Sequence, residues 1–354
     1  MLTLWEGRDG GYVAGMSWSW SQPKESIREK RIAADRPVYF ISDLHLGDGS
    51  RSDIFMRKDH ALLELLARVR DEGARLVIVG DAIDFYQAWN LTAVLRAHGP
   101  LLRALSELAD HNGVTYIYGN HDHDIALFHE LFRWDVCSTL RIGSDIVVQH
   151  GHQFDPFIGP ELQSSALMTQ LHHAIERVVG WVRMPLHEFY TPANRFVYWA
   201  FHKWWQLLKV RGALFRRVGL GELARRSEDW VSYWVRSEAG DPMSMLFPAL
   251  TGAQQMGATT LVCGHAHMPG VVHSRGVRYV NTGSWTYGYA QYARFDGEEF
   301  VVRDWITGRE FGEELYATAL SGELVDITMD RWWKNQYLGW FRFRSAELRR
   351  QAAQ

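Results

Sequence analysis

Short apolar runs alternate with longer amphipathic segments through the first third of the chain. Three runs, at 38–41, 76–79 and 114–118, have the length of buried strands. Between them, residues 54–72 and 91–110 repeat leucine and other apolar residues at helical spacing. Strands that alternate with helices predict crossover units and therefore a largely parallel sheet.

The later part of the chain changes rhythm. Two further apolar runs, 145–149 and 259–263, each end next to a histidine-containing motif. After residue 267, short segments alternate apolar and polar side chains, which is typical of antiparallel hairpins. We expect these hairpins to close a second sheet. The four segments are 271–273, 277–281, 289–295 and 300–305.

The pattern also divides the chain into regions. Residues 1–36 are rich in Gly, Ser and charged residues and are expected to form a peripheral lead-in. A main domain follows at 37–310, interrupted at 156–245 by a segment that is helical in pattern and dense in tryptophan. We expect this segment to be an inserted helical subdomain. Residues 311–354 form an aromatic and basic C-terminal segment.

Composition narrows the class of protein. A chain of 354 residues that is 47% apolar can bury a large core. Its 38 basic and 41 acidic residues give a formal charge of −3, which excludes a globally basic nucleic-acid binder. Two cysteines, Cys137 and Cys263, are too few for a disulfide framework or a cysteine-built zinc site. With neither a signal-peptide pattern nor an apolar stretch of about eighteen residues, we expect a cytoplasmic protein.

Five of the predicted strands end in residues that can bind a metal ion. Because the ends of parallel strands meet at one edge of a sheet, we expect these residues to converge. Carboxylate, imidazole and amide ligands without thiolate indicate Mn²⁺, Fe or Zn²⁺ at a hydrolytic centre. Seven candidate ligands fit two ions that share a carboxylate. The motifs are DLH at 43–45, GDAID at 80–84, GNHD at 119–122, HGH at 150–152 and GHAH at 264–267.

These motifs, in this order, resemble the DxH, GDxxD, GNHD, HG and GHxH blocks of the calcineurin-like metallophosphoesterase family. The resemblance covers about 38–155 and 245–305. It implies an α/β fold, the two-sheet αββα sandwich of the metallophosphoesterase type, here with an inserted helical subdomain. It also implies a hydrolase that uses two divalent metal ions, for which we expect Mn²⁺, with Fe or Zn²⁺ as alternatives.

The resemblance assigns roles within the site. The implied metal ligands are Asp43, His45 and His267 at one ion, Asn120, His150 and His265 at the other, and Asp81 between them. His121 would stabilise the phosphoryl charge and protonate the leaving oxygen, and Asp84 would orient it. A hydroxide that bridges the ions would then attack phosphorus in line with the leaving group.

Other residues near the motifs keep two interpretations. His152 and Asp155, in HGHQFDP, either line the substrate pocket or cap the turn before Pro156. The block Asn281–Trp285 either forms a wall of the site or makes a tight turn. The histidines outside the motifs, His98 among them, are interpreted as ordinary surface or core residues.

The insert and the tail combine aromatic and basic residues. Residues 195–226 carry eight basic side chains and one acidic, and residues 331–350 carry six and one. Most of the stretch FVYWAFHKWWQLLKV, at 196–210, is aromatic or aliphatic. A helix with so wide an apolar face either buries it against protein or lies in a membrane interface. Both interpretations stay open. If the segment contacts the membrane surface, we expect a cytoplasmic protein that is peripherally bound to the membrane.

One branch of the family, the UDP-2,3-diacylglucosamine pyrophosphatases, shares DLHLGD, GDAIDFYQ, HGHQFD and NTGSW-like blocks with this chain. The chain departs from that branch in its longer insert and in His121, where the best-known members carry Arg. We therefore expect a phosphoester substrate. The alternative is a lipid-linked nucleotide cleaved at its pyrophosphate on the membrane surface. A non-enzymatic scaffold is less favoured, because no ligand is missing. A nuclease is less favoured, because the basic residues cluster with tryptophan in the insert and the tail, and no nucleic-acid partner is expected.

Overall fold

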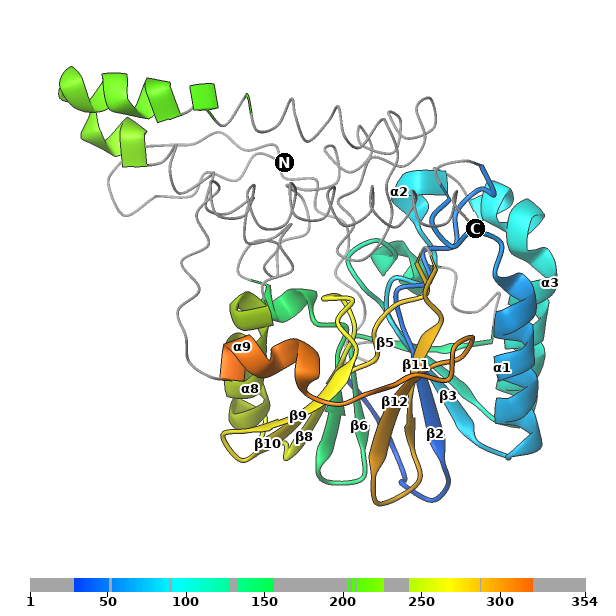
Figure 1. The fold of residues 1–354 in the computed structure, drawn as a ribbon. Coiled ribbons are helices and arrows are strands. Elements are labelled where there is room, and N and C mark those ends of the chain that lie inside the picture. The colour runs from blue at the N-terminus through cyan, green and yellow to red at the C-terminus, as the bar shows by residue number, and fades with distance from the viewer. Residues whose placement is uncertain are drawn as a thin grey trace, which may run out of the picture.

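Two β-sheets stacked between layers of helices form the body of the protein (Figure 1). The computed structural model describes residues 29–50, 53–88, 91–127, 133–155, parts of 203–225, 242–286 and 288–320. Most of the predicted insert and the segment 331–350 lie outside these described residues.

The seven-stranded sheet holds the first three predicted strands side by side. Its order is β13-β12-β11-β2-β3-β4-β5, with β2 to β5 parallel and β11 antiparallel to β2. The bounds are β2 (Val38–Ile41), β3 (Arg75–Val79), β4 (Val114–Ile117), β5 (Asp135–Cys137), β11 (Gln291–Phe295), β12 (Phe300–Asp304) and β13 (Glu310–Phe311).

The six-stranded sheet contains the two later motif strands, β7 and β8. Its order is β1-β6-β7-β8-β10-β9, in which β7, β8 and β10 are parallel and β9 is antiparallel. Strand β1 falls in the predicted lead-in, and pairs with β6. The bounds are β1 (Glu29–Ile32), β6 (Thr139–Ile142), β7 (Ile146–Val148), β8 (Thr260–Cys263), β9 (Gly270–Ser274) and β10 (Val277–Asn281).

The late hairpins differ from the sequence prediction. They do not close one sheet, because β9 and β10 join the six-stranded sheet whereas β11 and β12 join the seven-stranded one. Ala293 of β11 pairs with Phe40 of β2. An alternating pattern predicts which face of a strand is buried, but it does not predict which strand lies next to it in a sheet.

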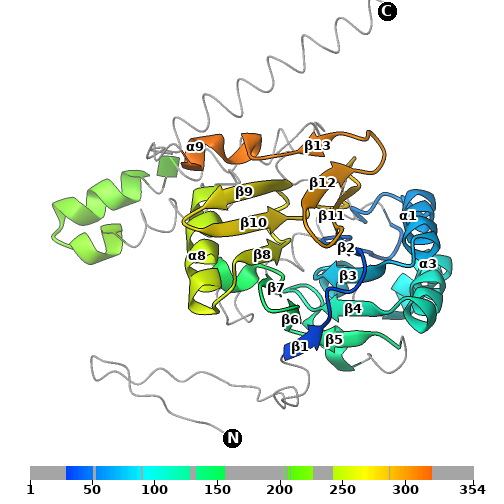
Figure 2. The same cartoon turned by 90° about the horizontal axis from the view of Figure 1, so that it is seen from below.

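Three apolar clusters show why the layers stack in this order. Phe40, Val79 and Val262 belong to the core between the sheets. The outer face of the seven-stranded sheet is covered by α1 (Asp59–Asp71) and α3 (Leu91–His111), and that of the six-stranded sheet by α8 (Pro242–Gln255) (Figure 2). The predicted αββα sandwich is confirmed. The shorter helices are α2 (Phe85–Ala88), α9 (Ala317–Leu320), η2 (His123–Leu127), η3 (His152–Phe154) and η4 (Glu314–Tyr316).

Helix α1 illustrates how the sequence produces this layer. Leu62, Leu65, Leu66 and Val69 recur at helical spacing, and all four are buried against the sheet. Burying each such side chain contributes about 2 kcal/mol. The helix begins at Asp59, later than residue 54, where its apolar pattern starts, because the preceding residues form a turn.

Candidate metal centre

The ends of five strands, from both sheets, bring the predicted site residues together. In the seven-stranded sheet the backbone N–H of Asp43 donates to the carbonyl of Gly80 at 3.0 Å. Across to the other sheet, the backbone N–H of His265 donates to Oδ2 of Asp43 at 3.0 Å. The two sheets therefore share one site, at the edge where β2, β3, β4, β7 and β8 end.

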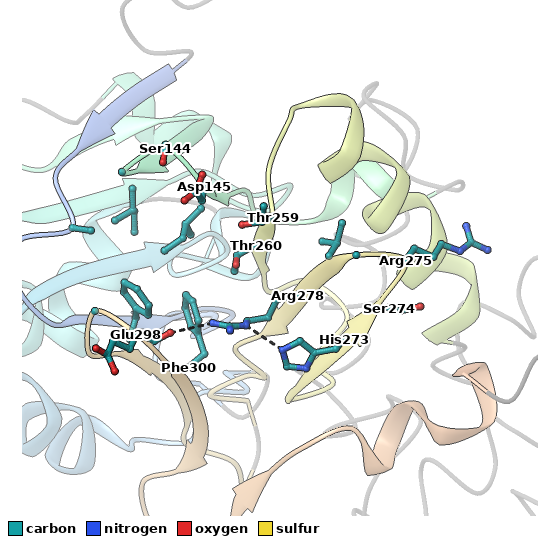
Figure 3. Close-up of a pocket in the computed structure, with 18 residues that line it drawn as sticks. Ser144, Asp145, Thr259, Thr260, His273, Ser274, Arg275, Arg278, Glu298 and Phe300 are labelled. Carbon is teal, nitrogen blue, oxygen red and sulfur yellow. Dashed lines mark hydrogen bonds between the residues drawn. The ribbon is translucent and has the colours of Figure 1, made fainter.

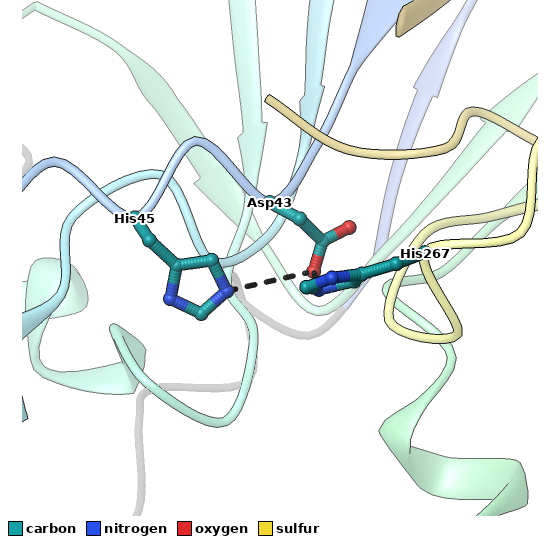
Figure 4. Close-up of side chains that lie close together, drawn as sticks. All are labelled: Asp43, His45 and His267. Atoms are coloured by element: carbon teal, nitrogen blue, oxygen red, sulfur yellow. Dashed lines mark hydrogen bonds and ion pairs between the residues drawn. The ribbon is translucent and has the colours of Figure 1, made fainter. Parts of the chain in front are cut away.

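The donor atoms fall into overlapping groups, in each of which all atoms lie within 4.8 Å of one another. Figure 4 shows the first group, with the carboxylate of Asp43 between the rings of His45 and His267. Asn120 joins the last group, because its Oδ1 lies 3.2 Å from Nε2 of His150. The groups are Asp43, His45 and His267; His45, Asp81 and His121; and Asp81, His150 and His265.

Nε2 of His45 provides the test of whether these residues fit a metal ion. It is buried and has no hydrogen-bond partner in the described part of the chain. It lies 3.9 Å from Oδ2 of Asp81 and 4.0 Å from Oδ1 of Asp43. These distances are too long for hydrogen bonds, but they are below the limit of about 4.2 Å for two atoms that each lie about 2.1 Å from a shared ion. The residues present therefore fit a metal centre.

Hydrogen bonds set which ring nitrogen faces the cluster. Nδ1 of His150 donates to the carbonyl of Val79 at 2.7 Å, since a carbonyl can only accept. The lone pair of His150 is then on Nε2, which lies 3.3 Å from Oδ2 of Asp81. A ligating histidine in a metal site is commonly held through its other nitrogen in this way.

The backbone is strained at the same positions. Five of the seven candidate ligands have φ between 47° and 60°, in the left-handed region that residues other than glycine seldom adopt. Such conformations cost about 1–3 kcal/mol each and concentrate at functional sites. Gly119 permits a close approach, because a Cβ there would collide with the carboxylate of Asp81. The five are Asp43, His45, Asp81, His265 and His267.

Burial and neighbouring charge act on the titration of these groups. Burial favours a neutral Asp81, but the imidazoles of His150 and His121 outweigh it and hold the pKa of its carboxyl well below the usual range. Burial is the main reason that the pKa of His45 falls to about 4. Asp81 is thus kept as an anion beside a neutral His45. At His150 burial opposes the charge, but the carboxylates of Asp81 and Asp43 outweigh burial and raise the pKa of the ring to about 10, so an ion that binds there has to displace a proton.

His121 belongs to one of the donor groups, with His45 and Asp81, and Asp84 lies beside it. Nδ1 of His121 is 3.3 Å from Oδ1 of Asp84, and the His121 side chain is 12% exposed whereas that of Asp84 is fully buried. Asp84 also accepts the backbone N–H of Gln87 at 3.0 Å. The other oxygen of Asp84 lies 3.0 Å from Nδ1 of His45, a second contact that the sequence analysis did not anticipate.

The block Asn281–Trp285 supports the site from behind. Thr282 and Trp285 are fully buried. Oγ1 of Thr282 lies 2.6 Å from Oγ of Ser42, which in turn contacts Asp43. Nδ2 of Asn281 donates to the carbonyl of Gly264 at 2.8 Å, just before the GHAH histidines. The block therefore lies directly behind the backbone that carries Asp43 and His265.

Asp122 also supports the site. Its carboxylate accepts backbone N–H groups of Gly119 at 2.6 Å and of Ala82 at 2.7 Å, and the hydroxyl of Tyr116 at 2.5 Å. It thereby joins the loops that follow β3 and β4. Its place in the GNHD motif was the only indication of this role in the sequence.

A cavity of about 710 Å³ lies at the opposite ends of the strands of the six-stranded sheet, away from the candidate metal centre (Figure 3). Its lining includes Asp145 and Thr260, at the starts of β7 and β8, and none of the predicted ligands. Arg278 crosses it and donates to Nε2 of His273 at 3.2 Å and to the carbonyl of Glu298 at 3.3 Å.

The described part of the insert presents apolar side chains to solvent. Residues 209–217 are helical, and basic residues accompany the apolar ones along this segment. No helix among the described residues is long and apolar enough to cross a membrane. The apolar side chains, three or four residues apart, are Leu207 (68% exposed), Val210 (68%), Leu214 (56%) and Val218 (60%).

A two-sheet α/β sandwich with acids and imidazoles clustered at its strand ends defines a class of metal-dependent hydrolases. A family model for calcineurin-like phosphoesterases matches residues 36–308. The chain belongs to the calcineurin-like phosphoesterase family and is a metal-dependent phosphoester hydrolase.

Individual relatives are distant. The chain is 25% identical over 283 residues to a UDP-2,3-diacylglucosamine hydrolase of Ralstonia nicotianae, a match that covers 76% of this chain and 91% of the relative. Among solved structures, a phosphoesterase from E. coli matches with a TM-score of 0.37 and 15% identity over 77% of this chain and 96% of its own. Vacuolar protein sorting 29 from Cryptosporidium parvum matches with a TM-score of 0.34 and 14% identity, over 78% and 94%.

Proposed function

We propose that the chain hydrolyses phosphoesters with two divalent cations, Mn²⁺ in preference to Fe or Zn²⁺. One set of ligands is Asp43, His45 and His267, the other is Asn120, His150 and His265, and Asp81 contributes to both. The observation that carries this proposal is the buried Nε2 of His45, which faces two carboxylates without a hydrogen bond. Bound there, the ions would neutralise charge on phosphoryl oxygens and lower the pKa of a water.

The residues around the ligands supply binding and proton transfer. Asp84 accepts from Nδ1 of His121, and this contact would orient the Nε2 edge of that ring toward the substrate. His121 would donate there to a phosphoryl oxygen and then protonate the leaving oxygen, while Asp84 stabilises the imidazolium. Asp81 and Asp43 repel a second anion unless cations are present, so the ligands also make phosphate binding depend on metal.

A comparison of variants tests this proposal. Asp81→Ala and His265→Ala should abolish Mn²⁺-dependent hydrolysis of a chromogenic phosphodiester, because each removes a candidate ligand. His60→Ala is the matched control, since the His60 side chain is 88% exposed on α1. Hydrolysis at the full rate by either ligand variant would exclude the proposed centre.

A lipid-linked nucleotide is the substrate that we propose in particular, cleaved at its pyrophosphate. The Ralstonia relative supports this class, as its name states that it hydrolyses UDP-2,3-diacylglucosamine. The second support is the exposed stripe formed by Leu207, Val210, Leu214 and Val218, with basic residues beside it. Apolar side chains flanked by cations favour the interface of an anionic membrane, where such a substrate would reside.

Flotation with vesicles of anionic phospholipid tests the membrane contact. The full chain should float, and Leu214→Asp should reduce the bound fraction several-fold. Ala213→Asp is the matched control, because it adds the same charge at an exposed position one residue away, on another side of the helix. Equal flotation of all three proteins would contradict a contact through this stripe.

A further inference from the structure

The loop that follows β7 brings a carboxylate onto one of the candidate ligands. Oδ2 of Asp155 lies 3.1 Å from Nε2 of His265, and the two side chains are only 15% and 10% exposed. The two interpretations that the sequence left for Asp155, lining the substrate pocket or capping a turn, do not include a contact with a candidate ligand. The contact therefore requires its own explanation.

The local sequence explains how Asp155 reaches His265. Gly151 has φ of 118°, which only glycine adopts readily, and this reverses the chain directly after His150. The short helix η3 (His152–Phe154) follows, closed by hydrogen bonds from Phe154 N to Gly151 O at 2.9 Å and from Asp155 N to His152 O at 3.2 Å. Phe154 packs against the apolar cluster under α8, which anchors the turn. Asp155 is thus directed back toward the strand ends.

The backbone of His265 is fixed, but its ring needs a further restraint. The N–H of His265 donates to Asp43, and the N–H of Gly264 donates to the carbonyl of His150 at 2.9 Å. These contacts place the Cα and leave rotation of the ring free. Among the hydrogen bonds of the described residues, the one to Asp155 acts on the ring itself.

We propose that Asp155 is a positioning residue, which holds Nε2–H of His265 and so presents Nδ1 of that ring to the metal centre. A carboxylate can only accept, so the proton of the ring lies on Nε2 and the lone pair on Nδ1. Two other candidate ligands follow the same principle, His150 through the carbonyl of Val79 and His45 through Asp84. This inference rests on the proposed two-ion centre.

The geometry argues against Asp155 as an eighth ligand. The donor atoms of Asp81, His150 and His265 lie mutually within 4.8 Å, and the described residues give no such group that contains Asp155. A carboxylate that contacts the distal nitrogen of a ligating imidazole orients the ring and raises its basicity. Loss of such a partner typically lowers metal affinity 10- to 100-fold.

Titration of the chelator-treated full chain with Mn²⁺ tests the inference. Wild type should bind two ions, and Asp155→Ala should bind one of them about 10- to 100-fold more weakly, with the other unchanged. Asp155→Asn should fall between, because its amide oxygen still accepts from Nε2–H but carries no charge. Asp124→Ala is the matched control: its side chain is 50% exposed, follows the GNHD motif and contacts His123 rather than a candidate ligand.

Absorption spectra with saturating Co²⁺ separate positioning from ligation. Asp155→Ala should reach the wild-type spectrum at a higher Co²⁺ concentration, because the ligand atoms are the same. An altered spectrum at saturation would make Asp155 a ligand and overturn the inference. Wild-type affinity in Asp155→Ala would also overturn it, and would leave the centre intact. If wild type itself bound no ion, the proposed centre would be the part that fails.

Discussion

Nδ1 of His45 lies 3.0 Å from Oδ2 of Asp84, and both side chains are completely or almost completely buried. The other oxygen of this carboxylate faces Nδ1 of His121 at 3.3 Å. One buried acid therefore orients a candidate metal ligand and the candidate proton donor together. Metal affinity and proton transfer should consequently depend on the same residue.

Replacement of Asp84 by asparagine should affect both functions. The amide keeps the shape but is neutral, so the concentration of Mn²⁺ needed for half-maximal activity should rise by about 10- to 100-fold. The kcat should fall by about 100-fold or more, since the imidazolium of His121 loses its counter-charge. Asp71→Asn, at a side chain that is 69% exposed, is the control. A change in only one of the two quantities would mean that Asp84 serves a single histidine.

Removal of His121 should separate chemistry from metal binding. His121→Ala should keep both ions, while kcat falls by about 10²- to 10⁴-fold on a phosphodiester with an alkoxide leaving group. The loss should be much smaller with a nitrophenolate leaving group, which departs without a proton. Metal content and the two rates are the measurements. Loss of an ion, or equal losses on both substrates, would contradict the role of proton donor.

The carboxylate of Asp122 should matter for stability more than for chemistry. Asp122→Ala leaves the N–H groups of Gly119 and Ala82 and the hydroxyl of Tyr116 buried without their acceptor. The free energy of unfolding should fall by about 3 kcal/mol, against about 1 kcal/mol for Tyr116→Phe. Urea unfolding monitored by fluorescence measures both. Equal and small effects would show that water replaces the carboxylate.

His98 should make stability depend on pH. Burial opposes its positive charge, but Asp53 and Asp59, at 3.0 and 2.8 Å, outweigh burial and raise the pKa of His98 to about 9. Because the unfolded value is about 6.5, the stabilisation is complete below pH 6.5 and is lost as the pH rises through 9.

The comparison of wild type with His98→Gln isolates this effect. Lys58 shifts in the opposite direction, since burial lowers its pKa to about 7, but it is present in both proteins. The difference in unfolding free energy between the two proteins should therefore shrink from pH 6.5 to pH 10. A difference that stays constant over this range would show that His98 is not charged in the folded chain.

The sequence predicted the strand ends well because each combines an apolar run with a polar motif. The runs before Asp43, Asp81 and Asn120 are continuous and hydrophobic, as buried parallel strands require. It did not predict β1 or β6, whose sequences EKRI and TLRI contain charged residues and are too short to show a period. Nor could it reveal that β7 and β8 belong to a different sheet from β2.

Contacts between residues that are far apart in the chain could not be predicted from the sequence either. His98 belongs to no motif and was interpreted as an ordinary histidine. Its ring nevertheless contacts both Asp53 and Asp59, which lie about 40 positions earlier in the chain. The kink of α3 at His98, two residues before Pro100, directs the ring inward. The role proposed for Asp155 likewise depends on its contact with His265, which lies 110 residues later in the chain. Spacing along the chain indicates which residues share a face, but it does not pair side chains across a fold.

In the proposed centre one buried carboxylate, that of Asp81, serves two metal ions. Metal content of the Mn²⁺-loaded, dialysed protein, measured together with its electron paramagnetic resonance spectrum, tests this most directly. Wild type should hold about two ions for each chain and give a spin-coupled spectrum, and Asp81→Ala should lose the coupling. One ion or none in wild type, or an unchanged coupled spectrum in Asp81→Ala, would contradict it.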